Sequence, residues 1–368
     1  MLIESMSIQS LQIPFKVSFS HASADRNQTQ SVLVSATSKD GQTGYGEGCP
    51  REYVTGESLA SVFEFFHAHQ DEVSELSDLS GLQNWVVDHR QVIDANPAAW
   101  CAMELALLDL LGKSSQQSLE TLLGMQELQG TFQYSAILGT ANPKVFEKVL
   151  RMYREMGFTD FKVKLMGDRI VDQRNISLVN TYLDNTCRIR FDANNLWQDA
   201  DSAASYLSSL DRPFWAVEEP LTTEQYAELT KLATSLGVKI ILDESFLRLN
   251  QIDLLDNNAE CWLINVRISK MGGFLRSIEI VNACRQRGIR VIIGAQVGET
   301  SLLTRAALTV ANNAGDILIA QEGAFGSYLL EKDIGEPSLM FRQGGRLDID
   351  NSSLQKGFGN GIEVSECR

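Results

Sequence analysis

The spacing of hydrophobic residues along the chain changes from one part to the next. Near the N-terminus apolar and polar residues alternate loosely, which predicts β-strands, and Lys39-Asp40-Gly41 predicts a hairpin turn. From residue 58 to 124 apolar residues recur at a helical spacing of about 3.6, most clearly after Pro97. The predicted strands cover residues 2–13, 31–36 and 42–47. We therefore expect residues 1–125 to form an α+β domain.

Beyond residue 130 the pattern becomes regular. Short apolar segments recur about every 25 residues, and amphipathic helical stretches separate them. Strands that alternate with helices favour a parallel sheet, and eight repeats favour a closed (β/α)₈ TIM barrel over an open sheet. The eight predicted strands cover residues 132–138, 160–165, 187–191, 214–217, 239–242, 261–266, 290–293 and 317–320. We expect an α/β barrel over residues 126–324, capped by the α+β domain. The polar tail from about residue 325 to 368 is expected to pack back on that domain.

Composition and charge limit the partners of the chain. With 32 Lys and Arg against 47 Asp and Glu, the net charge is −15, which disfavours nucleic acid. No apolar run reaches the roughly 18 residues of a membrane helix, and the N-terminus does not resemble a secretory signal. Six scattered cysteines without a CxxC pair are typical of reduced thiols in the cytoplasm. The expected partners are a small-molecule substrate and further copies of the chain, with no nucleic acid and no membrane.

Charged residues stand where five successive barrel strands are predicted to end. This is the end at which TIM barrels carry their active sites. All four histidines lie within the first 89 residues, so a site in the barrel must work without imidazole. The candidate residues are Lys162, Lys164, Asp192, Glu218, Asp243 and Arg267.

Lys162 and Lys164 are two residues apart on one strand, so both side chains point to the same face. A neighbouring positive charge lowers the pKa of a lysine and makes it a usable base near neutral pH. Taken alone, the pair is also compatible with two surface lysines at the end of a strand.

Asp192, Glu218 and Asp243 follow three consecutive predicted strands. Three carboxylates that converge at a barrel mouth repel one another, and a hard divalent cation such as Mg²⁺ relieves that repulsion. Each residue alone is equally compatible with a helix N-cap or a surface charge. Glu219 and Glu244 follow immediately and are alternative ligands or residues that orient the ligands.

Taken together, the motifs resemble the enolase superfamily, in particular its muconate-lactonizing-enzyme subgroup, over nearly the whole chain. They are Lys162-Val163-Lys164, Asp192-Ala193-Asn194, Val217-Glu218-Glu219-Pro220, Asp243-Glu244-Ser245 and Lys270-Met271-Gly272-Gly273. The resemblance implies one Mg²⁺ on Asp192, Glu218 and Asp243. The ion would hold a substrate carboxylate and stabilise the enediolate that forms when the α-proton leaves. Lys164 would be the base and Lys162 a cation, while loops 18–30 and 48–58 would close over the substrate.

The sixth strand departs from the family pattern. Members of the family usually carry a lysine there, and this chain has Arg267. Arginine keeps its proton, so Arg267 is expected to act as a cation opposite Lys164 and not as a second base. Lys270 lies an odd number of residues further on and is expected to point elsewhere if the strand extends that far.

A reaction with one base is therefore the leading interpretation. It would be a muconate cycloisomerase-like ring closure or a syn elimination by a lyase, on a small carboxylate. The first alternative is an epimerase or racemase of dipeptides or N-acyl amino acids. The family's dipeptide epimerases carry Asp-x-Asp at the eighth strand, where this chain has Ala320-Gln321-Glu322-Gly323, which weakens the dipeptide alternative. The second alternative is a metal-binding barrel without catalytic activity.

Overall fold

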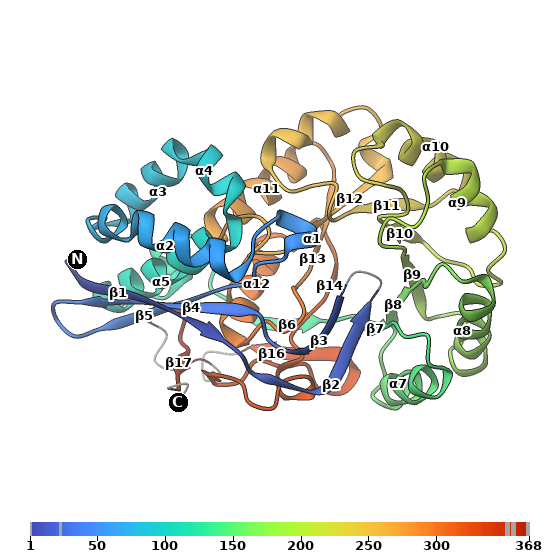
Figure 1. The fold of residues 1–368 in the computed structure, drawn as a ribbon, viewed down its shortest axis with the longest axis horizontal. Coiled ribbons are helices and arrows are strands. Elements are labelled where there is room, and N and C mark those ends of the chain that lie inside the picture. Colours follow the sequence, from blue (N-terminus) through green and yellow to red (C-terminus); the bar gives the residue numbers. More distant parts are fainter. Residues whose placement is uncertain (1, 22–23, 350–353, 355–357, 366–368) are drawn as a thin grey trace.

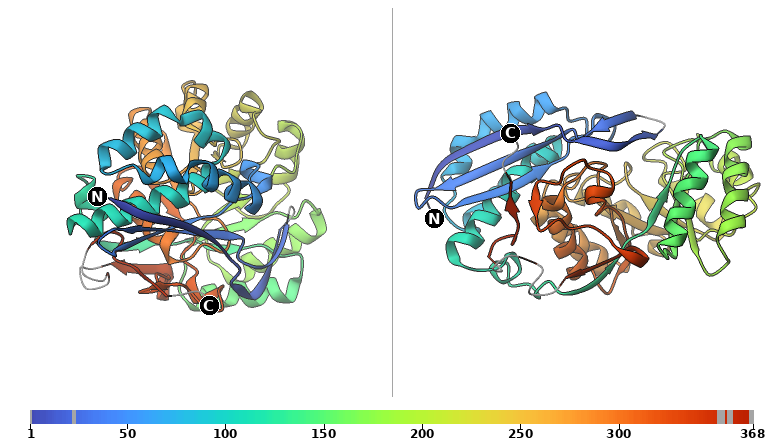
Figure 2. Two further views of the ribbon diagram at one scale, coloured as in Figure 1. Left: turned by 60° about the vertical axis from the view of Figure 1, so that its left-hand side comes forward. Right: turned by 90° about the horizontal axis from the view of Figure 1, so that it is seen from below.

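The computed structural model describes residues 2–21, 24–349, 354 and 358–365. The N-terminal region combines a three-stranded antiparallel sheet, in the order β1-β4-β5, with helices that cover one side of it (Figure 1). Its elements are β1 (Ile3–Leu11), β2 (Pro14–His21), β3 (Ala24–Gln28), β4 (Ser31–Ser38), β5 (Thr43–Gly48), α1 (Glu52–Thr55), α2 (Leu59–Ser74), α3 (Leu79–Asp88), α4 (Arg90–Ala95), α5 (Pro97–Ser115) and α6 (Leu119–Leu122). Most of the expected loop 18–30 is a hairpin of β2 and β3, which projects from the capping sheet toward the barrel (Figure 2); residues 22–23 lie outside the described part.

The second region is a parallel sheet of eight strands, ordered from β7 to β14 as in the sequence. The sheet curls until its edges meet, and Ser135 N donates to Gln321 O at 2.8 Å. This confirms the predicted (β/α)₈ barrel with its N-terminal cap. The elements are β6 (Gly130–Gln133), β7 (Ala136–Leu138), α7 (Pro143–Glu155), β8 (Asp160–Lys164), α8 (Arg169–Tyr182), β9 (Arg188–Asp192), α9 (Ala200–Leu207), β10 (Ala216–Glu218), α10 (Tyr226–Leu236), β11 (Lys239–Leu242), η1 (Leu249–Leu255), η2 (Ala259–Cys261), β12 (Trp262–Val266), α11 (Phe274–Gln286), β13 (Arg290–Ile293), α12 (Ser301–Asn313) and β14 (Leu318–Gln321).

The C-terminal segment contacts both regions. It contains η3 (Gly326–Tyr328), β15 (Gly335–Glu336), η4 (Gln343–Gly345), β16 (Arg346–Ile349) and β17 (Glu363–Val364). Strand β16 pairs with β6 below the barrel, while Asn360 N donates to Asp109 Oδ1 on α5 at 2.8 Å. The domain boundaries at residues 125 and 325 stay a prediction.

Glycines in β5 let helix α5 lie directly on the capping sheet. A Cβ atom at Gly44, Gly46 or Gly48 would come within 2.1–2.2 Å of a backbone oxygen of α5. Pro97 at the start of α5 suits the first turn of a helix, where the missing N–H is not needed. The helix is buried on nearly all sides and so forms the centre of the capping region.

The barrel interior has an apolar layer beneath a charged one. The apolar layer consists of Ala216, Ile241, Leu263, Ile292 and Ala320. Side chains two residues apart on a strand share a face, so the residues two positions further along point into the same interior. On β8 and β9 the polar character extends deeper, since Lys162 and Arg190 replace apolar side chains there.

The capping region is fixed over one side of the barrel mouth. Cys49 N donates to Ser269 Oγ at 2.8 Å, and the Arg51 guanidinium donates to Val297 O. Ser269 and Val297 belong to the loops that follow β12 and β13. The segment 48–58 is therefore anchored beside the strand ends, where a covering loop was expected.

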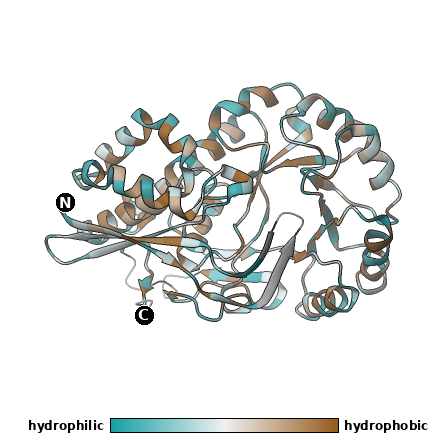
Figure 3. Ribbon diagram, viewed as in Figure 1, coloured by the Kyte–Doolittle hydropathy of each residue, from teal (hydrophilic) through white to brown (hydrophobic). Residues whose placement is uncertain are grey.

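The barrel helices have a hydrophobic side and a hydrophilic side (Figure 3). Helix α7 shows this clearly, since it buries Phe146, Leu150 and Tyr153 against the sheet. Among the residues that the structure describes, no helix has the length and apolar character needed to span a membrane.

Candidate active site

The candidate residues lie at one end of the barrel. In the parallel register Lys164 pairs with Asp192, and Asp192 pairs with Glu218, so the three form a row across β8, β9 and β10. Asp243 directly follows β11, and Arg267 directly follows β12. The alternation of side chains along parallel strands therefore brings all the predicted residues to the barrel mouth.

Lys162 is a buried cation held by three carboxylates. Its Nζ donates to Glu218 Oε1 and Oε2 at 3.1 and 2.9 Å and to Glu322 Oε2 at 3.0 Å, and it is 3.4 Å from Asp192 Oδ2. Burial by itself lowers the pKa of this ammonium group, but the carboxylates outweigh burial and the pKa is raised. Lys162 is therefore fixed in its protonated form.

Lys164 is the more accessible lysine. Its side chain is 11% exposed, against 2% for Lys162, and its Nζ lies 2.9 Å from Asp192 Oδ2 and 3.1 Å from Asn194 Oδ1. Gly139, which follows β7, makes room for it, because a Cβ there would lie 2.8 Å from Lys164 Cδ. Gly139 could not be identified from the sequence, since nothing in its neighbourhood along the chain points to Lys164.

The pKa values of the neighbouring carboxylates Asp192 and Glu218 are shifted in opposite directions. Burial raises the pKa of both groups. At Asp192 the two lysines outweigh burial, so its pKa is lowered. At Glu218 the nearby carboxylates act together with burial against Lys162, so its pKa is raised.

Lys270 lies beyond the end of its strand and contacts Asp243. Its Nζ donates to Asp243 Oδ1, Asp243 O and Asn265 O, each at 2.8 Å. The expectation that it points elsewhere applied only to a strand that reaches Lys270. Strand β12 ends at Val266, so side-chain alternation does not extend to Lys270, and the following turn redirects it. Lys270 is fully buried and fixes one oxygen of Asp243.

Arg267 points into the mouth. Its Nη2 forms an ion pair with Asp243 Oδ2 and lies 3.6 Å from Glu218 Oε1, while its Nη1 donates to Gln296 Oε1 at 3.2 Å. Burial lowers the pKa of the guanidinium, but Asp243 and Glu218 outweigh it and the pKa is raised. Arg267 is thus a permanent cation.

Two charged residues that the sequence analysis did not assign to the site complete the network. Arg190 is fully buried and donates to Glu322 Oε1 at 2.7 Å and to Asp160. Glu322 therefore uses one oxygen for Arg190 and the other for Lys162. Arg190 stands two residues before Asp192 on the same strand, so both side chains point to the same face. This spacing was visible in the sequence and could have placed Arg190 inside the barrel.

Glu219 positions the strand-end loop that carries Asp243. Its Oε1 accepts from Asp243 N at 2.6 Å and from Ser245 N at 2.8 Å, and its Oε2 accepts from Ser245 Oγ at 2.7 Å. Glu219 itself has a φ of 40°, in the left-handed region. Both of its oxygens are engaged by the polypeptide, so Glu219 orients Asp243.

The donor set suits a hard divalent cation in its chemistry. Asp192, Glu218 and Asp243 offer buried carboxylate oxygens, and Asp243 Oδ2 has Arg267 as its ion-pair partner. Over the described residues the three do not form a ready-made metal cluster, since Lys162 and Arg267 lie between them. A metal ion on these ligands would therefore require a cationic side chain to move.

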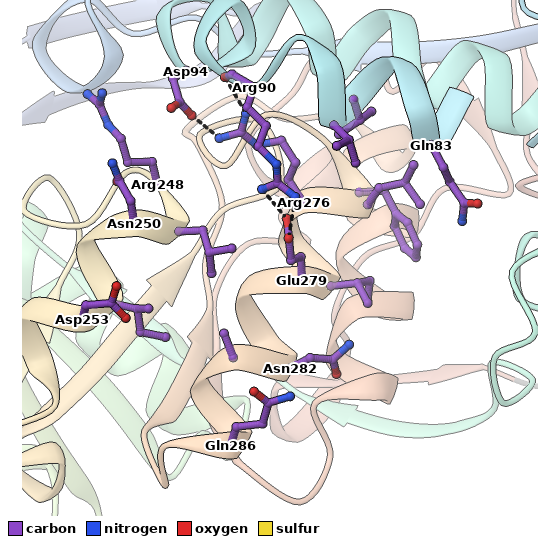
Figure 4. A pocket seen from close by; sticks show the side chains of 18 of the residues that line it. Gln83, Arg90, Asp94, Arg248, Asn250, Asp253, Arg276, Glu279, Asn282 and Gln286 are labelled. Atoms are coloured by element: carbon purple, nitrogen blue, oxygen red, sulfur yellow. Dashed lines mark hydrogen bonds and ion pairs between the residues drawn. The ribbon is translucent and has the colours of Figure 1, made fainter. Parts of the chain in front are cut away.

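A separate hollow of about 1020 Å³ lies outside the mouth, where α3 and α4 face η1 and α11 (Figure 4). Its charged side chains pair with one another: Arg90 Nη2 is 2.7 Å from Glu279 Oε1, and Arg276 contacts Asp94. None of the candidate residues at the strand ends lines it.

The chain is similar to several characterised proteins over most of its length. It is similar to the hydrophobic dipeptide epimerase of Enterococcus faecalis, with 25% identity over 315 residues, 84% of this chain and 87% of the relative. It is similar to the N-succinyl-L-Arg/Lys racemase of Bacillus cereus, with 23% identity over 371 residues, 100% of this chain and 96% of the relative. A third relative is the cis-3-hydroxy-L-proline dehydratase of Roseibium aggregatum, with 28% identity over 271 residues, 72% of this chain and 71% of the relative.

Solved structures of the first two relatives share the fold. The structure of the Bacillus cereus racemase matches with a TM-score of 0.83 at 22% identity and covers 99% of this chain and 96% of its own. The structure of the Enterococcus faecalis epimerase, complexed with Mg and the dipeptide L-Leu-L-Tyr, matches with a TM-score of 0.84 at 23% identity, over 98% of this chain and 99% of its own.

Two family models account for most of the sequence. Residues 4–124 match the N-terminal domain of mandelate racemase and muconate lactonizing enzyme, and residues 144–367 match the enolase C-terminal domain-like family. Both parts of the fold agree with this assignment. The chain belongs to the mandelate racemase/muconate lactonizing enzyme group of the enolase superfamily.

Proposed function

We propose that the protein removes the proton α to the carboxylate of an N-acylated amino acid and acts as its racemase or epimerase. The observation that carries the proposal is the position of Lys164, a partly exposed amine beside a buried cation and three carboxylates. The characterised relatives include an epimerase and a racemase, and their names favour our first alternative over the cycloisomerase that we expected first.

In this proposal Asp192, Glu218 and Asp243 would hold Mg²⁺. When bound, it would withdraw charge from the substrate carboxylate and make the α-proton more acidic. The all-carboxylate donor set supports the choice of a hard ion. The related Enterococcus faecalis epimerase was solved with Mg, which supports the same choice.

The remaining steps belong to side chains of the protein. Neutral Lys164 takes the α-proton and becomes an ammonium group. Lys162 stays protonated between Glu218 and Glu322 and stabilises the negative charge that develops on the substrate. The buried carboxylates fix Lys162 in place, so this stabilisation needs no rearrangement when the proton moves.

The acid at the eighth strand supports an acylated nitrogen in the substrate. A substrate with a free ammonium group needs a carboxylate that can pair with it. Glu322 is buried, and its two oxygens are already bound by Lys162 and Arg190. An uncharged amide nitrogen makes no such demand, so an N-acyl amino acid suits the site better than a dipeptide with a free amino terminus.

Arg267 favours a second candidate, a one-face elimination. A guanidinium keeps its proton and does not remove one from the second face of the α-carbon, so inversion at that face would take its proton from solvent. Proton transfer between a carbon acid and a guanidinium is costly, because each unit by which the pKa values of two partners differ corresponds to about 1.36 kcal/mol. Elimination needs Lys164 alone, and one relative is a dehydratase.

The experiment follows the α-proton in D₂O with Mg²⁺ present. N-succinyl and N-acetyl amino acids of both configurations are compared with dipeptides of the same residues, by NMR for exchange and by chiral chromatography for inversion. Exchange with inversion of the N-acyl compounds supports the proposal. Exchange with loss of a β-substituent supports elimination, and preference for dipeptides contradicts the assigned substrate class. The absence of exchange with every compound would point to a barrel without catalytic activity.

A further inference from the structure

We propose that Arg267 competes with the divalent cation for Asp243 and Glu218, and that Gln296 receives the guanidinium when the cation binds. The inference rests on the metal site of the proposed function. It makes Arg267 a built-in regulator of metal affinity, in addition to its place opposite Lys164.

The competition follows from the oxygens that Arg267 uses. Its Nη2 is ion-paired with Asp243 Oδ2 and lies 3.6 Å from Glu218 Oε1, and both residues are proposed metal ligands. The other oxygen of Asp243 is bound by Lys270 at 2.8 Å. A cation that uses Asp243 must therefore displace one of these two side chains.

Lys270 is the less mobile of the two. It is fully buried, and two backbone oxygens, of Asp243 and Asn265, hold it in addition to the carboxylate. Arg267 is 11% exposed at the mouth, and its Nε has no hydrogen-bond partner. A guanidinium group keeps its charge at every working pH, so it gives way by moving and not by losing a proton.

Gln296 provides a place for the displaced guanidinium. Its Oε1 already accepts from Arg267 Nη1 at 3.2 Å, and its Nε2 is buried without a partner, so the amide is free to adjust. The backbone of Gln296 is held by Glu299 Oε1, which accepts from Gln296 N at 2.6 Å. Movement toward Gln296 keeps one hydrogen bond of the guanidinium while releasing the two carboxylates.

The test measures Mg²⁺ binding by calorimetry without substrate. Arg267→Met removes the competing charge and is expected to lower the Kd for Mg²⁺ by about tenfold or more, because a like charge at the ligands is lost. Arg285→Met is the matched control, since Arg285 pairs with Asp316 on the surface and the change in net charge is identical. The control variant is expected to bind Mg²⁺ as the wild type does.

A double-mutant cycle tests the role of Gln296. Gln296→Leu removes the alternative partner and is expected to raise the Kd several-fold in the wild type, with no effect in Arg267→Met. Circular dichroism and thermal melting show whether each variant is folded. Asp243→Asn in the Arg267→Met background should abolish the tight binding.

Three results would overturn the inference. They are equal Kd values for Arg267→Met and Arg285→Met, the same effect of Gln296→Leu in both backgrounds, and tight binding that survives Asp243→Asn. If the protein exchanges the α-proton but gives any of these results, the proposed function stands and this inference is wrong. If Arg267→Met binds Mg²⁺ more tightly but the protein exchanges no α-proton, this inference stands and the proposed function is wrong.

Discussion

Lys164 and Arg267 stand on opposite sides of the barrel. Strand β8 carries Lys164 and strand β12 precedes Arg267, and three strands separate β8 from β12 in each direction around the closed sheet. A substrate between them presents one face to an amine that can take a proton and the other to a guanidinium that keeps its own. The two faces of the α-carbon are therefore chemically unequal, and the first two predictions depend on this.

Replacing Lys164 by alanine should lower the rate of α-proton exchange by about a hundredfold or more, the contribution of a well-placed general base. NMR in D₂O measures the rate. Lys231→Ala, at an exposed ion pair on α10, is the control and should leave the rate unchanged. Exchange that persists in Lys164→Ala would assign the base to another residue.

Arg267→Lys should make the two faces more alike. A lysine can give up and take back a proton, which a guanidinium does not, so exchange of the slower enantiomer should rise relative to the faster one. The ratio of the two exchange rates is the measurement. If the wild type already exchanges both enantiomers of one substrate at similar rates, Arg267 does not limit proton exchange on the second face of the α-carbon.

Gly139→Ala should lower kcat about tenfold while leaving the fold intact. The new Cβ would lie 2.8 Å from Lys164 Cδ and push this flexible side chain out of place, and misplaced catalytic groups lose rate steeply. The control is Gly81→Ala on α3, where the nearest atom would be at 3.5 Å, an ordinary contact. Equal kcat in the two variants would show that Lys164 tolerates the crowding.

Glu57 should make the protein less stable as the pH rises. Its carboxylate accepts from Ala98 N and Ala99 N at the start of α5, and burial raises its pKa from 4.5 to about 7 despite these bonds. Between these values the folded protein keeps a proton that the unfolded chain has released, so the contribution of Glu57 to the free energy of unfolding falls as the pH rises.

Glu57→Gln removes this titration. The free energy of unfolding of the variant minus that of the wild type should increase by about 1–3 kcal/mol from pH 4.5 to pH 7.5. Urea denaturation at the two pH values measures the difference, and Glu260→Gln at an exposed position serves as control. A stability difference between variant and wild type that does not change with pH would contradict the raised pKa of Glu57.

The amino-acid sequence predicts the barrel and the residues at its mouth. The repeat of strands and helices is a local pattern, and the positions at which strands end follow from it. Side-chain alternation then assigns Lys162, Lys164, Asp192 and Glu218 to the interior, because this alternation is a property of each strand alone. Arg267 in place of the usual lysine was also visible in the sequence.

The pairing of these charges depends on the folded structure and could not be predicted from the sequence. Glu322 binds Lys162 and Arg190 across 160 and 132 residues of sequence, and Lys270 turns back to Asp243 after β12 has ended. The expected loss of a proton by one of two adjacent lysines does not apply to Lys162, since three carboxylates from other strands surround it. Coulomb interactions depend on distance in space, and closure of the barrel sets those distances between groups that no local pattern connects.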